Sequence, residues 1–479
     1  MAQKSRYGSS VGVRRKSGTK RARRRKNLVL SLVSLLLSAG LGFACYGALH
    51  RAVPDGVTEA AAPSPTEEVT KMSVSSELAS ANRLYTEGYT ADLSEDDIWM
   101  EDFEDTRTPV DVKGIYLTSE VVKKNLDEIL ELLDTTELNA IVIDIKNDDG
   151  FICVENDSEY LAEIDNQYIL IDNVESLIET FHEHGVYCIA RIVCFRDIRS
   201  VRARNDFGVK MPDGSLMVDN SGYTWMNPLN TDTWEYLTEV GRVAVELGFD
   251  EVNFDYCRFS TDSKVKEADY GAELTTEVKQ DAIAGFVKYA CENLKPLGVY
   301  VSVDVFGVVL SSAVDAAAVG QDYARMCKYL DYICPMVYPS HYGSGYYNLD
   351  VPDAHPYDLI YNAMLDSKDS LQENVLKGRC AEVRPWLQAF TASWVKGHID
   401  YTGADVKAQI DATYDAGYNH GWLLWNASGS YANYRDGLLD QSQEGYLGTD
   451  RADASEDTSD ASEDTSETGE ETGGEQAGE

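Results

Sequence analysis

Between Asp111 and Tyr446 the sequence alternates repeatedly between a short apolar segment and a longer segment with helical periodicity. Such alternation is typical of α/β proteins, because a helix must return the chain to the start of each new parallel strand. Eight such units over about 335 residues fit a (β/α)8 TIM barrel with insertions. The predicted strands are Lys113–Thr118, Asn139–Lys146, Val186–Val193, Asp250–Asp255, Val299–Val305, Asp331–Tyr338, Arg384–Phe390 and Gly421–Trp425.

The segments between these strands have the four-residue spacing of helices that cover a sheet. An open doubly wound sheet is the alternative fold. It would more often carry a glycine-rich phosphate loop after the first strand, and the segment 116–120 is not one. The predicted helices are Glu120–Asp134, Val174–His184, Thr231–Leu247, Val278–Leu294, Tyr323–Tyr329, Pro356–Ser367 and Ala404–Ala416.

The N-terminal part of the chain predicts a membrane anchor. Residues 1–27 are basic and otherwise polar, whereas residues 28–49 contain no charged side chain. An uncharged run of this length spans roughly 33 Å as a helix, enough for a bilayer, and the basic flank is expected to stay in the cytoplasm. The alternative is a secreted protein whose signal is cleaved at Gly42-Phe43-Ala44. Residues 50–110 then form a linker.

The predicted barrel domain covers residues 111–446, and residues 447–479 form an acidic tail that repeats a seven-residue motif. From Thr449 onward the tail has no large apolar side chain to bury, which predicts disorder. The net charge of −39 is uneven, because the first 26 residues carry only basic charges. A body this acidic argues against nucleic acid as a partner, since phosphate binding needs a positive surface.

The sequence indicates neither a cofactor nor a metal. Nine cysteines occur without a Cys-x-x-Cys pair, mostly inside apolar segments, as expected for small buried residues. No histidine or acidic cluster has the spacing of a metal site, and no Gly-x-Ser-x-Gly motif supports a serine nucleophile. Acidic side chains are therefore the best candidates for chemistry.

The stretch Gly248–Phe259 provides the strongest candidate. Val252 and Phe254 alternate with Glu251, Asn253 and Asp255 at the two-residue period of a strand. Polar side chains on the inner face of a buried strand are costly unless they are paired or used. Because barrel enzymes keep their catalytic groups at the carboxyl ends of the strands, Asp255 is the leading catalytic candidate.

Two further carboxylates stand at equivalent positions. Asp304 lies near the end of the next predicted strand, at the same height as Asp255. Two close carboxylates push their pKa values apart, giving one proton donor and one anion, as glycoside hydrolysis requires. The structural alternative is that either acid simply pairs with Arg191 or Arg258. Asp144 is a third catalytic candidate and is expected to form an ion pair with Lys146 on one strand face.

Aromatic and polar side chains at the strand ends suit a sugar ligand, because flat rings with polar rims bind amphipathic molecules. Trp225, Trp394 and Trp425 are the preferred platforms, although any single ring can equally belong to the core. The remaining expected substrate-binding residues, for hydroxyls or an anionic sugar group, are Tyr116, Lys146, Arg191, Arg258, Tyr338, His341 and Gln388.

At these motifs the chain resembles a bacterial family of glycoside hydrolase TIM-barrel domains found on surface or exported proteins. The resemblance covers about residues 111–446, and it implies a hydrolase fold with an essential aspartate where Asp255 stands. Cys257 and Ser260 replace an apolar residue and a proline, and Ala389 stands where relatives often carry an acid. The matching motifs are Val112–Tyr116, Val142–Lys146, Ile189–Val193, Gly248–Phe259, Cys334–Tyr342, Arg384–Gln388 and Leu424–Ala427.

These observations predict a membrane-anchored extracytoplasmic glycoside hydrolase that uses paired carboxylates on a cell-surface or environmental polysaccharide. The alternative is a non-catalytic carbohydrate-binding barrel in cell-envelope assembly. Alanine at position 389, in place of the acid that relatives often carry, favours this alternative.

Overall fold

The computed structural model describes residues 105–376 and 380–439. The predicted anchor at residues 28–49, its basic flank, nearly all of the linker and the acidic tail lie outside these ranges. Within them, no helix combines the length and the apolar composition that crossing a bilayer requires.

Eight parallel strands close into a barrel, because β1 pairs with both β2 and β11. Around the barrel the order is β1, β2, β5, β6, β7, β8, β10 and β11. This confirms the TIM-barrel prediction. The strands are β1 (Val112–Leu117), β2 (Ala140–Lys146), β5 (Tyr187–Val193), β6 (Glu251–Asp255), β7 (Tyr300–Phe306), β8 (Tyr332–Met336), β10 (Trp386–Gln388) and β11 (Gly421–Trp425).

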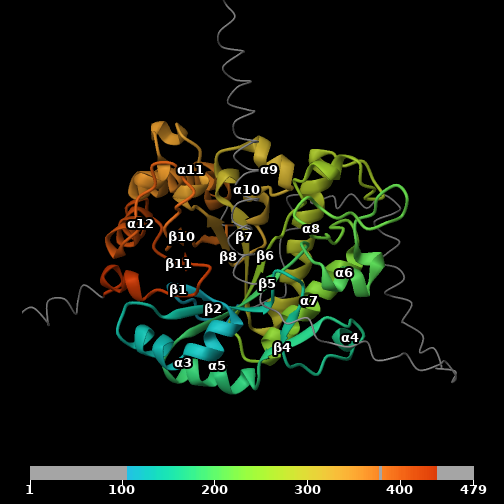
Figure 1. Cartoon of the computed structure of the whole chain (residues 1–479), viewed down its shortest axis with the longest axis horizontal. Helices are drawn as coiled ribbons and strands as arrows, with labels where there is room; N and C mark the ends of the chain where they lie inside the picture. The colour runs from blue at the N-terminus through green and yellow to red at the C-terminus, as the bar shows by residue number, and fades with distance from the viewer. Residues whose placement is uncertain (1–104, 377–379, 440–479) are drawn as a thin grey trace, which may run out of the picture. The chain divides into compact units, whose positions relative to one another are not determined.

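Helices surround the strands on the outside, as Figure 1 shows. Their amphipathic faces pack onto the barrel, and the helices return the chain to the next parallel strand. The helices are α3 (Ser119–Asp134), α5 (Val174–Glu183), α7 (Thr231–Glu246), α8 (Thr276–Leu294), α9 (Ala313–Val319), α10 (Tyr323–Met326), α11 (Pro356–Leu376) and α12 (Gly403–Asp415). Of these, α9 and α10 share the connection between β7 and β8.

Short insertions decorate this ring. They were not expected from the sequence, because elements of two to five residues give little periodic signal. Of these, β3 pairs antiparallel with β2, and β9 pairs with β8. The additional elements are β3 (Ile152–Val154), α4 (Glu159–Ala162), β4 (Gln167–Ile171), α6 (Arg199–Ala203) and β9 (Glu382–Val383).

The sixth and seventh barrel strands are shorter than predicted. The expected segments Asp331–Tyr338 and Arg384–Phe390 form strands only at Tyr332–Met336 and Trp386–Gln388. Each segment contains a proline, which lacks the N–H that a ladder hydrogen bond needs. The two strands accordingly share a single Cα register pair, Trp386 with Met336.

Strand alternation sorts the buried side chains into two layers. Outward-facing residues such as Ile192, Val252 and Phe254 join the large apolar cluster between the barrel and its helices. Inward-facing residues such as Tyr187 and Trp386 belong to a second, smaller cluster inside the barrel. The two-residue period therefore determines which polar residues enter the interior.

The lower part of the interior is held by a buried ion pair. The guanidinium of Arg384 donates to a carboxylate oxygen of Glu251, and both side chains are fully buried. Glu251 also accepts hydrogen bonds from Tyr187 at 3.2 Å and from Ser302 at 2.5 Å. A buried charge is tolerated only when its partners are supplied in this way.

Replacing Glu251 with glutamine should destabilise the protein by about 3–5 kcal/mol, because it leaves the Arg384 charge buried without an anion. Urea denaturation followed by circular dichroism measures the change. The control is Lys407→Met, which breaks the partly exposed pair with Asp411 and should cost less than about 1 kcal/mol. Equal losses in the two variants would contradict the stabilising role of the buried pair.

Candidate active site

The predicted acids Asp144, Asp255 and Asp304 lie at the carboxyl ends of β2, β6 and β7. Strand register brings them together with Arg191 of β5, since Asp144 pairs with Arg191 and Val193 pairs with Asp255. The next rung pairs Phe254 with Val303, which makes Asp255 and Asp304 neighbours. All these polar side chains are buried.

Arg191 joins two of the acids. Its Nη1 donates to Asp144 Oδ1 at 2.6 Å, while its Nε and Nη2 both donate to Asp255 Oδ2, at 3.1 and 2.5 Å. Asp144 Oδ2 accepts a further hydrogen bond from the Tyr116 hydroxyl at 2.6 Å. The structural alternative of pairing with Arg191 therefore applies to Asp255. Such pairing also keeps a carboxylate in the anionic form that a nucleophile or base needs.

Asp304 has a different environment. Its Oδ1 accepts hydrogen bonds from Trp386 Nε1 at 2.7 Å and from Asn253 Nδ2 at 2.9 Å. Its Oδ2 makes no hydrogen bond to any residue that the structure describes, and its carboxyl pairs with no cation there. A neutral carboxyl fits this arrangement, with Oδ1 as the acceptor and Oδ2 as the atom that carries the proton.

The pKa values of two acids are raised. Burial, and then the negative charge of Asp255, raise the pKa of Asp304 to about 8. Burial raises the pKa of Asp144 to about 6, although the Arg191 charge opposes this increase. At neutral pH Asp304 is therefore the best proton donor among these acids.

The chain turns sharply after Asp255. Tyr256 has a φ of 51°, in the left-handed region that residues other than glycine rarely adopt. Its backbone N–H donates to Asp255 Oδ1 at 2.5 Å, and its hydroxyl accepts a hydrogen bond from Arg196 at 2.6 Å. Strain of this kind costs about 1–3 kcal/mol and clusters at functional sites. The left-handed conformation of Tyr256 directs its backbone N–H toward the carboxylate of Asp255.

The expected pair between Asp144 and Lys146 is not formed, and this prediction was wrong. The register of β2 against β5 shifts between these two residues, which turns Lys146 away from Asp144. Lys146 is fully buried, and its ammonium pairs with Asp197 at 2.6 Å and donates to the Val193 carbonyl at 2.6 Å. The structure therefore places Lys146 behind the mouth of the barrel, where it supports the loop after β5.

Aromatic rings line one side of the site. Trp425 stacks on Tyr116 with ring centroids 4.1 Å apart, and the Arg191 guanidinium lies 5.4 Å from both rings. Trp394 stacks on Phe390 at 6.0 Å and is 39% exposed. Among the three expected platforms, Trp394 offers the most surface to a ligand.

The remaining predicted binding residues have separate surroundings. Tyr338 is buried and packs edge-on against His341, with ring centroids 5.3 Å apart. Burial lowers the pKa of His341 to about 4, so the imidazole is neutral near pH 7. Gln388 is fully buried and bonds to the Ser340 N–H and to Asp353, at 3.0 and 2.9 Å. Gln388 thus fixes the loops around the mouth.

Trp225 and Arg258 form another group, after β5 and β6. The Trp225 indole N–H donates to Asp219 at 2.9 Å, and the Arg258 guanidinium lies 4.9 Å from the Trp225 ring. This keeps Trp225 buried rather than exposed as a flat platform.

Sequence reasoning missed the supports of the acids. Asn253 and Trp386 hold Asp304, while Asp148 lies 3.7 Å from Arg191 and also pairs with Arg196. The inward position of Asn253 was readable from the alternation around Asp255. The contact between Trp386 and Asp304 could not be predicted, because it joins strands that are far apart in the sequence.

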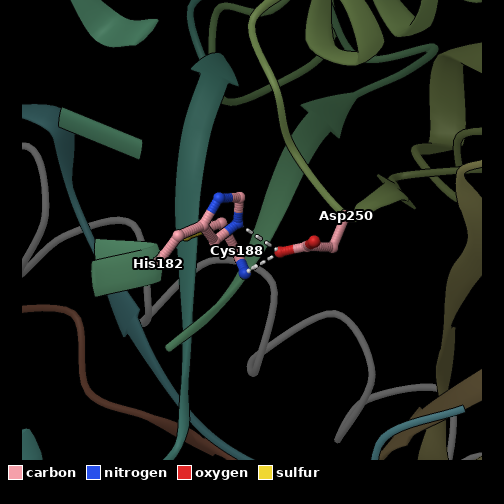
Figure 2. A group of neighbouring side chains, drawn as sticks. All are labelled: His182, Cys188 and Asp250. Atoms are coloured by element: carbon pink, nitrogen blue, oxygen red, sulfur yellow. Dashed lines mark hydrogen bonds and ion pairs between the residues drawn. The ribbon is translucent and has the colours of Figure 1, made fainter. Parts of the chain in front are cut away.

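One group of three possible metal ligands occurs among the described residues. The ligand atoms of His182, Cys188 and Asp250 lie within 4.8 Å of one another, near the amino ends of β5 and β6 (Figure 2). Asp250 Oδ2 already accepts hydrogen bonds from His182 at 2.9 Å and from the Cys188 N–H at 2.7 Å. Burial raises the pKa of the Cys188 thiol, which opposes the thiolate that metal binding needs. We interpret the group as a structural link.

A closed (β/α)8 barrel with acidic side chains at the carboxyl ends of its strands has the architecture of the TIM-barrel enzymes. Residues 114–431 match the family model described as "Putative glycosyl hydrolase domain". This match covers more than half of the chain, and the chain belongs to that family. The expected family resemblance is thereby confirmed. No curated protein matches the chain.

Solved structures also resemble the chain. A hypothetical protein from Ruminiclostridium thermocellum is 36% identical, with a TM-score of 0.36, over 40% of this chain and 97% of its own. The PgaB (BpsB) glycoside hydrolase domain from Bordetella bronchiseptica is 12% identical, with a TM-score of 0.49, over 69% of this chain and 99% of its own. The Bacillus megaterium spore cortex-lytic enzyme SleL is 10% identical, with a TM-score of 0.42, over 70% of this chain and 75% of its own.

The raised pKa of Asp304 predicts a stability effect. The native state keeps this proton up to about pH 8, whereas an unfolded carboxyl loses it near its ordinary pKa of 3.8. The free energy of unfolding should therefore fall as pH rises through this window. Asp304→Asn cannot ionise and still accepts from Trp386. The Tm of this variant should equal that of wild type near pH 4. At pH 9 its Tm should be higher, by roughly 2–4 °C for each kcal/mol of stability that the variant retains and wild type loses.

Thermal unfolding followed by circular dichroism at a series of pH values tests this expectation. Asp172→Asn, at a side chain that is 75% exposed, is the matched control for the loss of one charge. Parallel Tm curves for wild type and Asp304→Asn across this pH range would show that Asp304 ionises without cost, which contradicts a raised pKa in the native state.

Proposed function

We propose that the barrel hydrolyses O-glycosidic bonds of a polysaccharide, with Asp304 as the general acid and Asp255 as the nucleophile or general base. The observation that supports this most is the contrast between two neighbouring carboxyls. Asp255 is bonded to Arg191, whereas Asp304 has no cationic partner among the described residues and has a pKa raised to about 8. Glycoside hydrolysis needs this pairing of one anion with one neutral acid.

In the proposed reaction Asp304 protonates the oxygen of the leaving sugar while the C–O bond breaks. Asp255 either attacks the anomeric carbon directly or removes a proton from the attacking water. The negative charge of Asp255 also stabilises the positive charge that develops on the sugar ring. The separation of the two carboxyl groups across the bound sugar sets which route operates, about 5–5.5 Å for retention and about 6.5–9.5 Å for inversion.

Asp144 has a supporting role in this proposal. It accepts hydrogen bonds from Arg191 and Tyr116, so it orients the cation that holds Asp255. Trp394 and Trp425 supply ring surface for sugar units, and Tyr338 and His341 supply polar atoms close to them. Long glycans suit such a site, because several rings around the barrel mouth contact several sugar units at once.

The location of the enzyme is part of the proposal. The uncharged run at residues 28–49 follows a basic segment, which supports a single-pass anchor with the barrel on the outer side of the membrane. A cell-surface or environmental polysaccharide is the substrate that such a location provides.

A carbohydrate-binding barrel without activity is the second candidate. The observation that favours it is Ala389, a fully buried residue just beyond β10, where an acid was expected in relatives. If that acid is needed for turnover, this chain binds glycans and leaves them intact.

Asp255→Asn and Asp304→Asn should each lower kcat by about 10²–10⁴-fold while glycan binding is kept, because each removes a charge or proton needed only in the transition state. Reducing-end release from a panel of cell-wall and capsular glycans measures turnover. Activity should also decline as pH rises above about 8, since Asp304 then loses its proton.

Asp172→Asn serves as the control and should be fully active, because this side chain is 75% exposed and pairs only with the exposed Lys123 among the described residues. If wild type binds a glycan of the panel and cleaves none, the binding candidate replaces the enzyme. Full activity in both active-site variants would refute the assigned roles.

A further inference from the structure

Arg258 stands apart from the other buried arginines. Four arginine side chains that are at most 7% exposed each have a carboxylate within ion-pair distance. These pairs are Arg107 with Asp331, Arg191 with Asp255, Arg196 with Asp148 and Arg384 with Glu251. Arg258 is 8% exposed and forms no ion pair with any residue in the described ranges.

The hydrogen bonding of Arg258 is also incomplete. Only its Nη1 has a protein acceptor within the described ranges, the Phe259 carbonyl at 2.9 Å. A guanidinium has five N–H donors in a planar fork, so most of them remain available. A buried cation without an anion destabilises the folded protein unless a ligand supplies the missing charge.

Aromatic rings hold this guanidinium in place. Its central carbon lies 4.7 Å from the ring centroid of Phe306, 4.9 Å from that of Trp225 and 5.2 Å from that of Tyr256. The rings stabilise the cation through their faces, yet they accept no strong hydrogen bonds. Burial among these rings lowers the pKa of Arg258 to about 10.

The position of Arg258 is next to the candidate catalytic acids. It follows Asp255 by three residues beyond β6, and one of its rings, Phe306, ends β7, the strand that carries Asp304. The negative charge of Asp255 acts on Arg258 but is not bonded to it. A ligand group bound at Arg258 would lie beside the bond that the proposed acids attack.

We propose that Arg258 binds an anionic group of the glycan, a carboxylate, sulfate or phosphate on a sugar unit adjoining the cleaved bond. This rests on the proposed glycan-directed function and assigns its substrate class as acidic polysaccharides. The planar fork of arginine matches such oxyanions through two parallel hydrogen bonds. The net charge of −39 repels polyanions at long range, so the selectivity comes from this short-range contact.

Binding of matched glycan pairs to the full chain tests the proposal. Three pairs differ only in their anionic group: polygalacturonate and its carboxyl-reduced form, dextran sulfate and dextran, phosphomannan and mannan. Isothermal titration should give wild type a preference of roughly 10-fold or more for the anionic member of at least one pair. The pair that responds identifies the group. Equal affinity within all three pairs would overturn the proposal.

Arg258→Met should abolish this preference and leave the affinity for the neutral member unchanged, because methionine keeps the packing and removes the charge. Arg258→Gln is the second uncharged variant, used if the first fails to fold by circular dichroism. Arg325→Met removes an equal charge from a partly exposed pair with Asp281 and should keep the preference. An Arg258 variant that folds and keeps the full preference would refute the assignment.

Binding and cleavage separate the two proposals. A wild-type chain that selects anionic glycans through Arg258 and cleaves none refutes the hydrolase function alone. A chain that cleaves neutral and anionic members with equal kcat/KM refutes the role of Arg258 alone.

Discussion

The buried guanidinium of Arg191 determines the electrostatics of the barrel mouth. It is 1% exposed and is bonded to both Asp144 and Asp255. A cation in this position needs anions around it, and three of its N–H groups are directed at the carboxylates of Asp144 and Asp255. Burial raises the pKa of Asp304, the neighbour of Asp255, and the negative charge of Asp255 raises it further, so the proton stays on Asp304 at neutral pH. The Arg191 ion pair on one acid and burial without a cationic partner among the described residues on the other thus make two identical side chains chemically different.

The interior below the mouth supports this arrangement. Asn253 and Trp386 hold one oxygen of Asp304. Glu251 and Arg384 form a second buried ion pair deeper in the barrel. Every one of these groups points inward because strands alternate, while the apolar contacts with the helices lie outside. Stability therefore comes mainly from the outer layer, which leaves the interior free to carry charges.

The sequence was sufficient for the architecture and for the acids. Eight strands were located within a few residues, and the alternation around Asn253 and Asp255 identified the inward face of β6. Side-chain partners were less predictable. A register shift in β2 moved Lys146 to Asp197, and Gln388 became a loop support through Asp353. Such contacts join distant segments, so no local pattern encodes them. That no described residue forms an ion pair with Arg258 is likewise visible only in three dimensions.

The most direct test of these roles is the pKa of the Asp304 carboxyl, measured by ¹³C NMR titration and assigned by the loss of its signal in Asp304→Asn. We expect a value near 8 in wild type. In Asp255→Asn the value should fall but stay above the usual range, because the neighbouring charge is gone while the burial remains. A wild-type value near 4, or one that Asp255→Asn does not change, would contradict the division of roles between the two acids.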